Sequence, residues 1–305
     1  MTDEILRRIL EEKRAEKARA ALEAEARMTA AFSVPEISDA QRAYVTALHK
    51  CLMRGRQPDD SVNALHDAYV TALAAHGYGE EDFVPTVNCS VCGDTGISDG
   101  RPCACIREKF IRELGIACDV DPNGLLCADF DPSSISDKAQ AERLAKAYAV
   151  MDRYTSGYPS VTRRIIVFSG KTGTGKTYLA AATAREMVSR GYSAVTLSAM
   201  KFNNTMLKCH TSPYEERESI LHDVLTADML IIDDLGTEPR YKNVTCEYLL
   251  LVLEERSSAK LSTVITTNLS ADDILHVYNE RIFSRLCDKR AALFMNFEGE
   301  DLRRQ

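Results

Sequence analysis

The sequence contains no long hydrophobic run. Within its 305 residues, no window approaches the roughly 18 to 20 apolar residues that a membrane-spanning helix needs. The first residues, MTDEILRRILEEKR, are charged from the third position, so they lack the apolar centre of a secretory signal peptide. From these absences we expect a cytoplasmic protein without a membrane partner.

The chain also lacks an excess of positive charge. Its formal net charge is -7, which argues against an electrostatic grip on nucleic acid over the whole surface. Any contact with DNA is therefore expected to be focal and to use a local basic stripe. The hydrophobic content of 45% is enough for one of about two domains to bury a sizeable core.

Cysteine, in contrast, is plentiful. Ten cysteines in a small secreted chain would suggest a disulfide framework, but in a cytosolic protein of this length we expect reduced thiols or metal ligands. The stretch VNCSVCGDTGISDGRPCACIREK places Cys89 and Cys92 at Cys-x-x-Cys spacing, followed by Cys103 and Cys105. This spacing predicts a four-thiolate zinc site, with redox-active or incidental thiols as the alternative.

The two corners of this zinc site differ in quality. Gly93 directly follows Cys92 and allows the left-handed turn of a zinc knuckle. The Cys-x-Cys corner is tighter than usual, which makes Cys105 the least regular of the four ligands. With no histidine, no nearby acid and no open coordination position, the site is expected to be structural. Zinc would then supply folding free energy to a small module.

Helical patterns dominate the first part of the chain. Residues 3–27 are strong helix formers and predict an arm, which is either a solvated helix or a partner-binding one. Residues 40–55 and 61–77 are two further helical patterns separated by RQPDD, so they predict a helical hairpin. We expect an N-terminal helical region at 1–80 for partner binding and a zinc module at 81–117.

From about residue 160, apolar strands alternate with helices. This order predicts a parallel α/β sheet flanked by helices, in a domain that we place at 118–305. The expected strands are RIIVFSG, AVTLSA, MLIIDD, STVITTN and AALFMNF.

The first of these strands leads into GKTGTGKT, which fits the phosphate-loop pattern and opens a helix. Its glycines let backbone N–H groups wrap phosphates, and the helix N-terminus adds positive potential. Lys176 is expected to reach the β and γ phosphates, and Thr177 to place its hydroxyl on magnesium. The predicted nucleotide-binding residues of the loop are Gly170, Lys171, Thr172, Gly173, Thr174, Gly175, Lys176 and Thr177.

Polar residues end two later strands. The strand MLIIDD carries Asp233 and Asp234 at its carboxyl end, where ligands bind in parallel α/β sheets. Asp233 suits magnesium and Asp234 suits a base for the attacking water, although the order of these two roles is open. STVITTN ends in Thr266, Thr267 and Asn268, polar groups able to hold that water or the γ-phosphate, with a β-branched strand that runs into a loop as the alternative. Further on, Arg281 and Arg285 lie one helical turn apart, where they are solvated, held in an ion pair, or able to reach a neighbouring subunit's phosphate.

The motifs GKTGTGKT, IIDDLG, VITTN and ERIFSRL together resemble AAA+ ATPases of the bacterial DnaC-like helicase-loader group. Relatives of that group include the IstB-like ATP-binding helpers of transposition. The resemblance covers residues 130–305 and extends into the N-terminal region through GYGEEDFVPTVNCSVCGDTG. The resemblance implies an AAA+ P-loop fold and an enzyme that hydrolyses ATP with Mg²⁺. The structural Zn²⁺ is expected separately, from the cysteine spacing.

The resemblance also implies residue roles. Asn268 matches the polar sensor that positions water, and Arg285 matches an arginine finger that acts on the ATP of a neighbouring subunit in a homo-oligomer. Arg303 looks like a second sensor for the γ-phosphate, with Arg304 as its rival. Catalysis would therefore involve Lys176, Asp234, Asn268 and Arg285.

The leading functional expectation is a helicase loader. Its N-terminal region would hold the replicative helicase, its ATPase domains would bind single-stranded DNA, and nucleotide state would control loading and release. One segment is either a DNA contact or a polar surface, and it carries Lys201, Phe202, Asn203, Asn204 and Lys208. The alternative is an ATP-dependent regulator of DNA transposition with a transposase as its partner. A small-molecule kinase or a non-hydrolysing scaffold fits the motifs less well.

Overall fold

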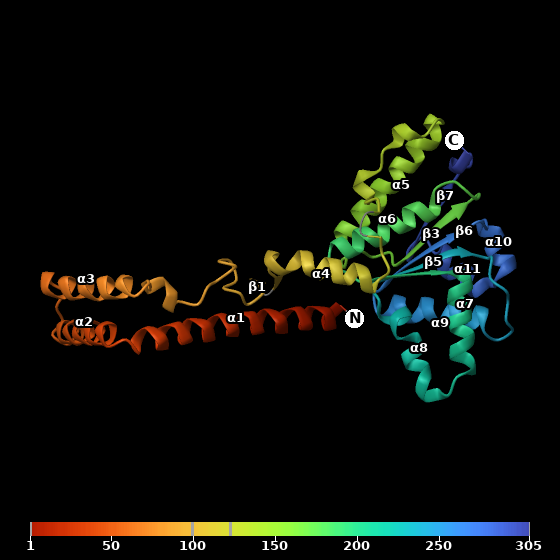
Figure 1. Cartoon of the computed structure of the whole chain (residues 1–305). Helices are drawn as coiled ribbons and strands as arrows, with labels where there is room; N and C mark the ends of the chain where they lie inside the picture. The colour runs from red at the N-terminus through yellow and green to blue at the C-terminus, as the bar shows by residue number, and fades with distance from the viewer. Residues whose placement is uncertain (1, 99–100, 122–123, 305) are drawn as a thin grey trace. The chain divides into compact units, whose positions relative to one another are not determined.

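The computed structural model describes residues 2–98, 101–121 and 124–304. The chain divides into two compact units, residues 7–107 and residues 108–305 with residues 1–6. We call them the N-terminal unit and, after the activity expected from its sequence motifs, the ATPase unit, and Figure 1 labels their elements. Compactness does not separate a helical region from a zinc module within the first unit, so the borders predicted at residues 80 and 117 stay predictions.

The N-terminal unit is mostly helical. Its elements are α1 (Thr2–Phe32), α2 (Pro35–Met53), α3 (Asp60–Ala75), the 3₁₀ turn η1 (Glu80–Phe83), the antiparallel strands β1 (Ile97–Ser98) and β2 (Arg101–Pro102), and α4 (Ala104–Ala117), which continues into the ATPase unit. The predicted arm forms a helix that is longer than the 3–27 expected from sequence. The predicted hairpin is confirmed as α2 and α3.

A small core holds the hairpin together. Ile37, Tyr69 and Leu73 are buried there with Ala31 from the end of α1. Tyr44 and Tyr69, which the sequence places at equivalent points of the two helices, stack with ring centroids 6.3 Å apart. The Asp59 side chain in the predicted turn accepts from the backbone N–H groups of the first turn of α3, which fixes where that helix begins.

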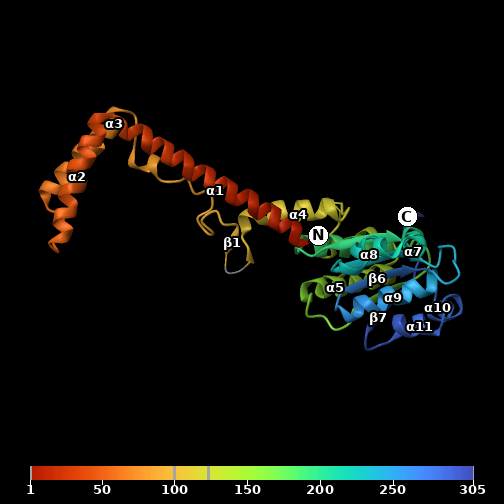
Figure 2. The same ribbon diagram turned by 90° about the horizontal axis from the view of Figure 1, so that it is seen from below.

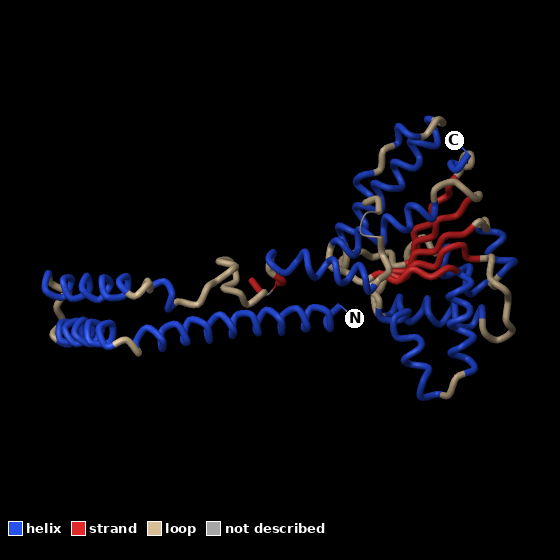
Figure 3. Tube along the Cα trace, viewed as in Figure 1, coloured by secondary structure: helices blue, strands red, loops and turns tan. Residues whose placement is uncertain are grey.

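The ATPase unit contains the parallel sheet that the sequence predicts. Its strands are β3 (Ile165–Gly170), β4 (Ala194–Ser198), β5 (Met229–Leu235), β6 (Ser262–Thr267) and β7 (Ala292–Phe297), in the order β4-β5-β6-β3-β7. All four neighbouring pairs are parallel. Figure 3 shows the strands gathered in this unit.

Helices cover both faces of this sheet. They are α5 (Lys138–Gly157), α6 (Lys176–Ser189), α7 (Ala199–Thr211), α8 (Tyr214–Thr226), α9 (Thr245–Ser258), α10 (Ala271–Val277) and α11 (Glu280–Cys287). Three further 3₁₀ turns are η2 (Cys127–Asp129), η3 (Pro132–Ser134) and η4 (Leu302–Arg304).

Alternation along the strands divides the core in two. Ile165 and Val167 of β3 pack into the large cluster formed with α7 to α11. Ile166 and Phe168 point to the opposite face, since successive strand residues alternate, and there α5 and α6 pack. Figure 1 shows α5 and α6 on one side of the sheet, and Figure 2, seen from below, shows α8 and α9 lying across the other.

Candidate functional site

The phosphate loop lies between β3 and α6. Gly170 has φ 148 and Gly173 has φ 80, both in the region that favours glycine. A Cβ atom at Gly170 would lie 2.0 Å from the Phe297 carbonyl oxygen, and one at Gly173 would lie 1.9 Å from Asp301 Oδ1. Gly170 is therefore required by the close approach of the Phe297 backbone as well as by its own conformation, whereas Gly173 is favoured by its conformation and meets only the Asp301 side chain.

Lys176 is buried at the first position of α6, with 4% of its surface exposed. Its Nζ donates to the carbonyl oxygens of Gly170 at 2.7 Å and Lys171 at 2.8 Å, and to Asn268 Oδ1 at 3.0 Å. Burial lowers the pKa of Lys176, while the nearby carboxylates of Asp234 and Asp233 oppose that shift. The ammonium group is thus held over the loop by acceptors that a phosphate can replace.

The two acids of β5 lie at an irregularity of the sheet. The β5–β6 register shifts between Ile232 and Leu235, and Asp234 has φ 58. In a regular strand, adjacent side chains point to opposite faces. The bulge and the left-handed residue bring both carboxylates to the lining of one cavity.

Thr266 of β6 organises this pair of acids. Its hydroxyl donates to Asp233 Oδ1 at 2.6 Å and accepts from the Asp234 backbone N–H at 2.8 Å. The same Asp233 oxygen accepts from Thr177 Oγ1 at 3.0 Å. Thr177 and Asp233, the two predicted magnesium ligands, are thus adjacent oxygen donors of the kind that Mg²⁺ binds.

These groups open onto a cavity of about 880 Å³. The predicted residues that line it are Thr172, Gly173, Gly175, Lys176, Thr177, Asp233, Asp234, Asn268 and Arg303. The other predicted loop residues, Gly170, Lys171 and Thr174, shape the loop from outside this lining. The structure thus brings together the groups that the sequence predicts for triphosphate and magnesium.

One wall of the cavity was missed by sequence reasoning. Phe130 stacks on Tyr148 with ring centroids 4.0 Å apart, and both rings line the cavity with Tyr178. Further lining residues are Leu125, Asp129, Asp131, Ser134, Ile135, Ser136, Leu144 and Leu302. Apart from Tyr178 and Leu302, these residues precede β3, in a segment that carries no phosphate-binding pattern. Only its aromatic residues could have signalled a wall suited to a flat base.

The C-terminal segment lies against the loop. The Leu302 backbone N–H donates to the Gly173 carbonyl oxygen at 2.9 Å, and Gln140 exchanges two hydrogen bonds with the backbone of Glu300. Arg303 Nε donates to Asp301 Oδ1 at 3.1 Å at the cavity wall. The side chain of its rival, Arg304, lies outside the described residues.

Arg285 does not line this cavity. On α11 its guanidinium pairs with Glu254 of α9 at 2.9 Å, and 56% of its side chain is exposed. The structure therefore does not bring Arg285 to the nucleotide cavity of its own chain.

The segment considered for DNA contact is partly internal. Phe202 and Asn203 on α7 are buried, and the Asn203 amide donates to the Pro239 carbonyl oxygen at 2.6 Å. Including these two as DNA contacts was wrong, because the amphipathic helix turns them into the core. Lys201 and Lys208 are exposed on its outer face.

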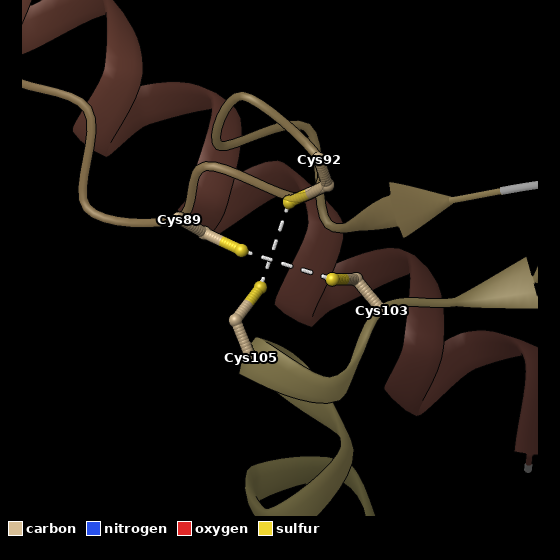
Figure 4. A group of neighbouring side chains, drawn as sticks. All are labelled: Cys89, Cys92, Cys103 and Cys105. Atoms are coloured by element: carbon tan, nitrogen blue, oxygen red, sulfur yellow. Dashed lines mark hydrogen bonds between the residues drawn. The ribbon is translucent and has the colours of Figure 1, made fainter.

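The four predicted cysteine ligands converge in the N-terminal unit. Their sulfur atoms all lie within 4.8 Å of one another, and Figure 4 shows them pointing to a common centre. The Cys89–Cys103 and Cys92–Cys105 sulfur separations are 3.8 Å and 3.6 Å. A tetrahedral site with Zn–S bonds of about 2.3 Å has sulfur–sulfur edges of about 3.8 Å, so the cluster fits zinc.

The backbone supports thiolate ligands there. Gly93 has φ 55, as the predicted knuckle needs, and the Gly96 N–H donates to Cys92 Sγ at 3.3 Å. Burial raises the pKa of the Cys92 thiol, but hydrogen bonds from the Gly96 N–H and the neighbouring thiols lower it by more. The net result is a pKa of about 6. The expectation of no nearby acid was wrong, because the Asp94 carboxylate accepts from the Cys89 backbone N–H at 3.0 Å.

The phosphate loop, the two acids and the parallel sheet define an ATP-binding protein of the AAA+ P-loop class. A family model described as "IstB-like ATP binding protein" matches residues 152–290. The replicative helicase loader DnaC of Buchnera aphidicola subsp. Acyrthosiphon pisum is 30% identical over 202 residues, which cover 65% of this chain and 74% of that protein. The chain belongs to this DnaC family of helicase loaders.

Other similarities are more partial. DnaC of Escherichia coli K12 is 28% identical over 159 residues, 52% of this chain and 62% of that protein. A solved structure titled "Crystal Structure of the DnaI" has a TM-score of 0.47 and 23% identity, covering 63% of this chain and 93% of that one. Among the described residues, no helix is long and apolar enough to cross a membrane.

The network around Thr266 gives a first prediction. Thr266→Val keeps the shape of a side chain with 0% exposure but removes the donor to Asp233 and the acceptor for the Asp234 N–H. We expect Mg²⁺-dependent tightening of ATP binding to be lost and the protein to be destabilised by about 1–3 kcal/mol. Titration of ATP with and without Mg²⁺, together with urea unfolding, measures both effects.

Thr267→Val is the matched control, because its equally buried hydroxyl donates to the Leu235 carbonyl oxygen and not to an acid. It should lower stability while leaving the Mg²⁺ dependence intact. If Mg²⁺ tightened ATP binding to the same extent in both variants, the assigned role of Thr266 would be contradicted.

The cysteine cluster gives a second prediction. Protein purified under reducing conditions should contain one equivalent of zinc, and Cys103→Ser should lose it because a tetrahedral site then has only three thiolates. Cys105→Ser tests the irregular corner in the same way. Cys51→Ser, which changes a half-buried thiol on α2, should keep full zinc content. Metal analysis of the four proteins is the measurement, and full zinc in Cys103→Ser would exclude the site.

Proposed function

We propose that this protein is an ATPase of helicase-loader type. It binds the replicative helicase through its N-terminal unit and single-stranded DNA through its ATPase unit. ATP binding and hydrolysis control loading and release of the helicase. The observation that carries this proposal is family membership combined with a cavity lined by the predicted lysine, the two predicted magnesium ligands, Asp234 and Asn268.

The residues of the cavity divide the chemistry among them. Lys176 and the loop N–H groups bind the β and γ phosphates, and Thr177 and Asp233 would hold Mg²⁺, which would supply charge neutralisation at the phosphate oxygens. Asp234 takes a proton from the attacking water, whose oxygen bonds to the γ-phosphorus as the bond to the β-phosphate oxygen breaks. Asn268 positions that water, and Arg303 contacts the γ-phosphate from the same chain.

Arg285 supplies the remaining charge in a neighbouring subunit. Its position outside its own cavity, with more than half of its side chain exposed, supports action on a second copy in a homo-oligomer. The zinc ion has a different task, since four thiolates leave no open coordination position for substrate. Zinc is therefore structural here.

A second candidate function is an IstB-like regulator of DNA transposition with a transposase as its partner. The family model that matches residues 152–290 favours it. This function would share the ATP site and the arginine finger. The two candidates differ in the partner, not in the chemistry of the cavity.

The arginine finger gives a third prediction. Arg285→Ala should reduce ATP turnover by about 10³-fold or more, because an arginine finger stabilises charge in the transition state, while ATP affinity stays nearly unchanged. Arg281→Ala, one helical turn away, is the control and should keep most turnover. Steady-state hydrolysis and equilibrium ATP binding separate the two effects.

Mixing tests whether the finger acts between chains. Lys176→Ala keeps Arg285 but loses phosphate binding, whereas Arg285→Ala keeps the cavity. Together they should regain turnover that neither has alone. Wild-type turnover by Arg285→Ala, or by a chain shown to be monomeric, would refute the inter-subunit role.

The partner gives a fourth prediction. The full chain should co-purify with a replicative helicase in an ATP-dependent manner, and residues 120–305 should not. In the full chain, Leu52→Glu with Met53→Glu should also weaken capture, since both side chains are exposed on the hairpin, at 60% and 75%. Ile116→Glu, an equally exposed apolar position outside it, is the control. Capture of a transposase, with no helicase bound by any form, would support the second candidate.

A further inference from the structure

The long helix α1 is attached to the cysteine cluster. Lys17 Nζ donates to the Gly93 carbonyl oxygen at 2.8 Å, and Lys13 Nζ lies 3.6 Å from Asp94 Oδ1. A Cβ atom at Gly96 would lie 2.8 Å from Leu10 Cδ2, so the helix packs directly on the knuckle. Figure 4 shows this helix, in faint red, passing behind the four sulfurs.

These α1 residues form one face of the helix. Leu10, Lys13 and Lys17 follow the three- and four-residue spacing that places side chains above one another. The sequence showed only alternating charges in this region, which favoured a solvated arm. The contacts with residues 93–96 instead define a docked surface.

Asp94 connects this surface to a metal ligand. It is buried, at 3% exposure, and its carboxylate accepts from the backbone N–H groups of Asn88 at 2.7 Å and Cys89 at 3.0 Å. The Gly93 N–H in turn donates to the Cys89 carbonyl oxygen at 2.9 Å. Lys13 and Lys17 therefore hold the two residues that fix the backbone around Cys89.

The charge of a zinc–thiolate cluster would also favour lysines at this position. A zinc ion with four thiolates carries two net negative charges, and cations nearby stabilise it. Lys13 is largely covered, with 16% of its side chain exposed, and Glu16 holds its ammonium group at 2.9 Å. A covered Lys13 and a Lys17 hydrogen-bonded to Gly93 match an anionic cluster better than a fully solvated helix face.

The far end of α1 belongs to the hairpin. Ala31 is fully buried in the hairpin core, and the Phe32 ring lies 5.6 Å from that of Phe83. The same continuous helix is thus tied to the cysteine cluster near its middle and to the hairpin at its end. It can act as a strut between the two.

We propose that Lys13 and Lys17 are outer residues of the zinc site and that zinc binding fixes α1 as a strut that presents the partner-binding hairpin. This inference rests on the proposed zinc site and goes beyond it. Loss of the metal releases α1 from residues 93–96 without unfolding the hairpin, whose core includes only the end of α1 and none of residues 93–96. Metal content therefore controls the position of the hairpin, not its fold.

The test uses the full chain in which Lys13→Gln and Lys17→Gln are combined. Zinc transfer to the chelator 4-(2-pyridylazo)resorcinol should be about 10-fold faster than in wild type, the loss typical of removing groups that orient metal ligands. Arg14→Gln with Arg19→Gln is the control, because it removes two exposed cations from the same helix. Lys13→Arg with Lys17→Arg should restore slow release.

Hydrogen exchange gives a readout independent of release rate. Removing zinc from wild type should cost the amides of residues 10–17 their protection while those of residues 62–73 keep it. Equal zinc release by the two double variants, or unchanged protection of residues 10–17 without zinc, would overturn the strut while leaving the zinc site in place. A chain that binds no zinc at all would overturn both, and metal analysis distinguishes that case.

Discussion

The hydrogen bonds of Thr266 to the two acids of β5 are the constraint on which the nucleotide site depends. A parallel sheet brings strand ends to one edge, but alternation would send Asp233 and Asp234 to opposite faces. The register shift and the left-handed conformation at Asp234 break that alternation, and the Thr266 hydroxyl satisfies the displaced backbone N–H. A buried N–H without a partner would cost about 1–3 kcal/mol. The bulge is stable because Thr266 of the neighbouring strand β6 supplies an acceptor for the Asp234 N–H.

The sequence was sufficient for the features that depend on local pattern. Five apolar segments became five parallel strands, and GKTGTGKT became the loop between β3 and α6, because periodicity and glycine spacing act over a few residues. Thr266 is separated from Asp233 by 33 positions, and Phe130 from Tyr148 by a folded segment, so their roles exist only in the tertiary structure. Phe202 and Asn203 failed as DNA contacts for a related reason. Their residue types suit a base, but helix orientation buries them.

The cysteine cluster divides in the same way between local and distant information. The spacing of Cys89 and Cys92 with Gly93 was enough to predict a zinc knuckle, and the structure shows how the tighter Cys105 corner still reaches the others. The contact from Lys17 to Gly93 spans 76 positions and could not be read from a helix of balanced charge. In a module this small, the cysteine ligands and the helix docked on them contribute stability that larger domains obtain from an apolar core.

Both arginines of the proposed mechanism form ion pairs within their own chain, but only one of these pairs lies at the nucleotide cavity. Arg303 is bound to Asp301 at the wall of its own cavity, whereas Arg285 is bound to Glu254 outside it. The latter pair is exposed on both sides, 56% and 38%, and exposed pairs contribute at most about 1 kcal/mol. A guanidinium–phosphate contact in a closed interface is stronger, since it is charge-assisted and shielded from water. In the proposed mechanism Arg285 would exchange Glu254 for a neighbour's phosphate, and breaking the exposed pair would cost at most about 1 kcal/mol.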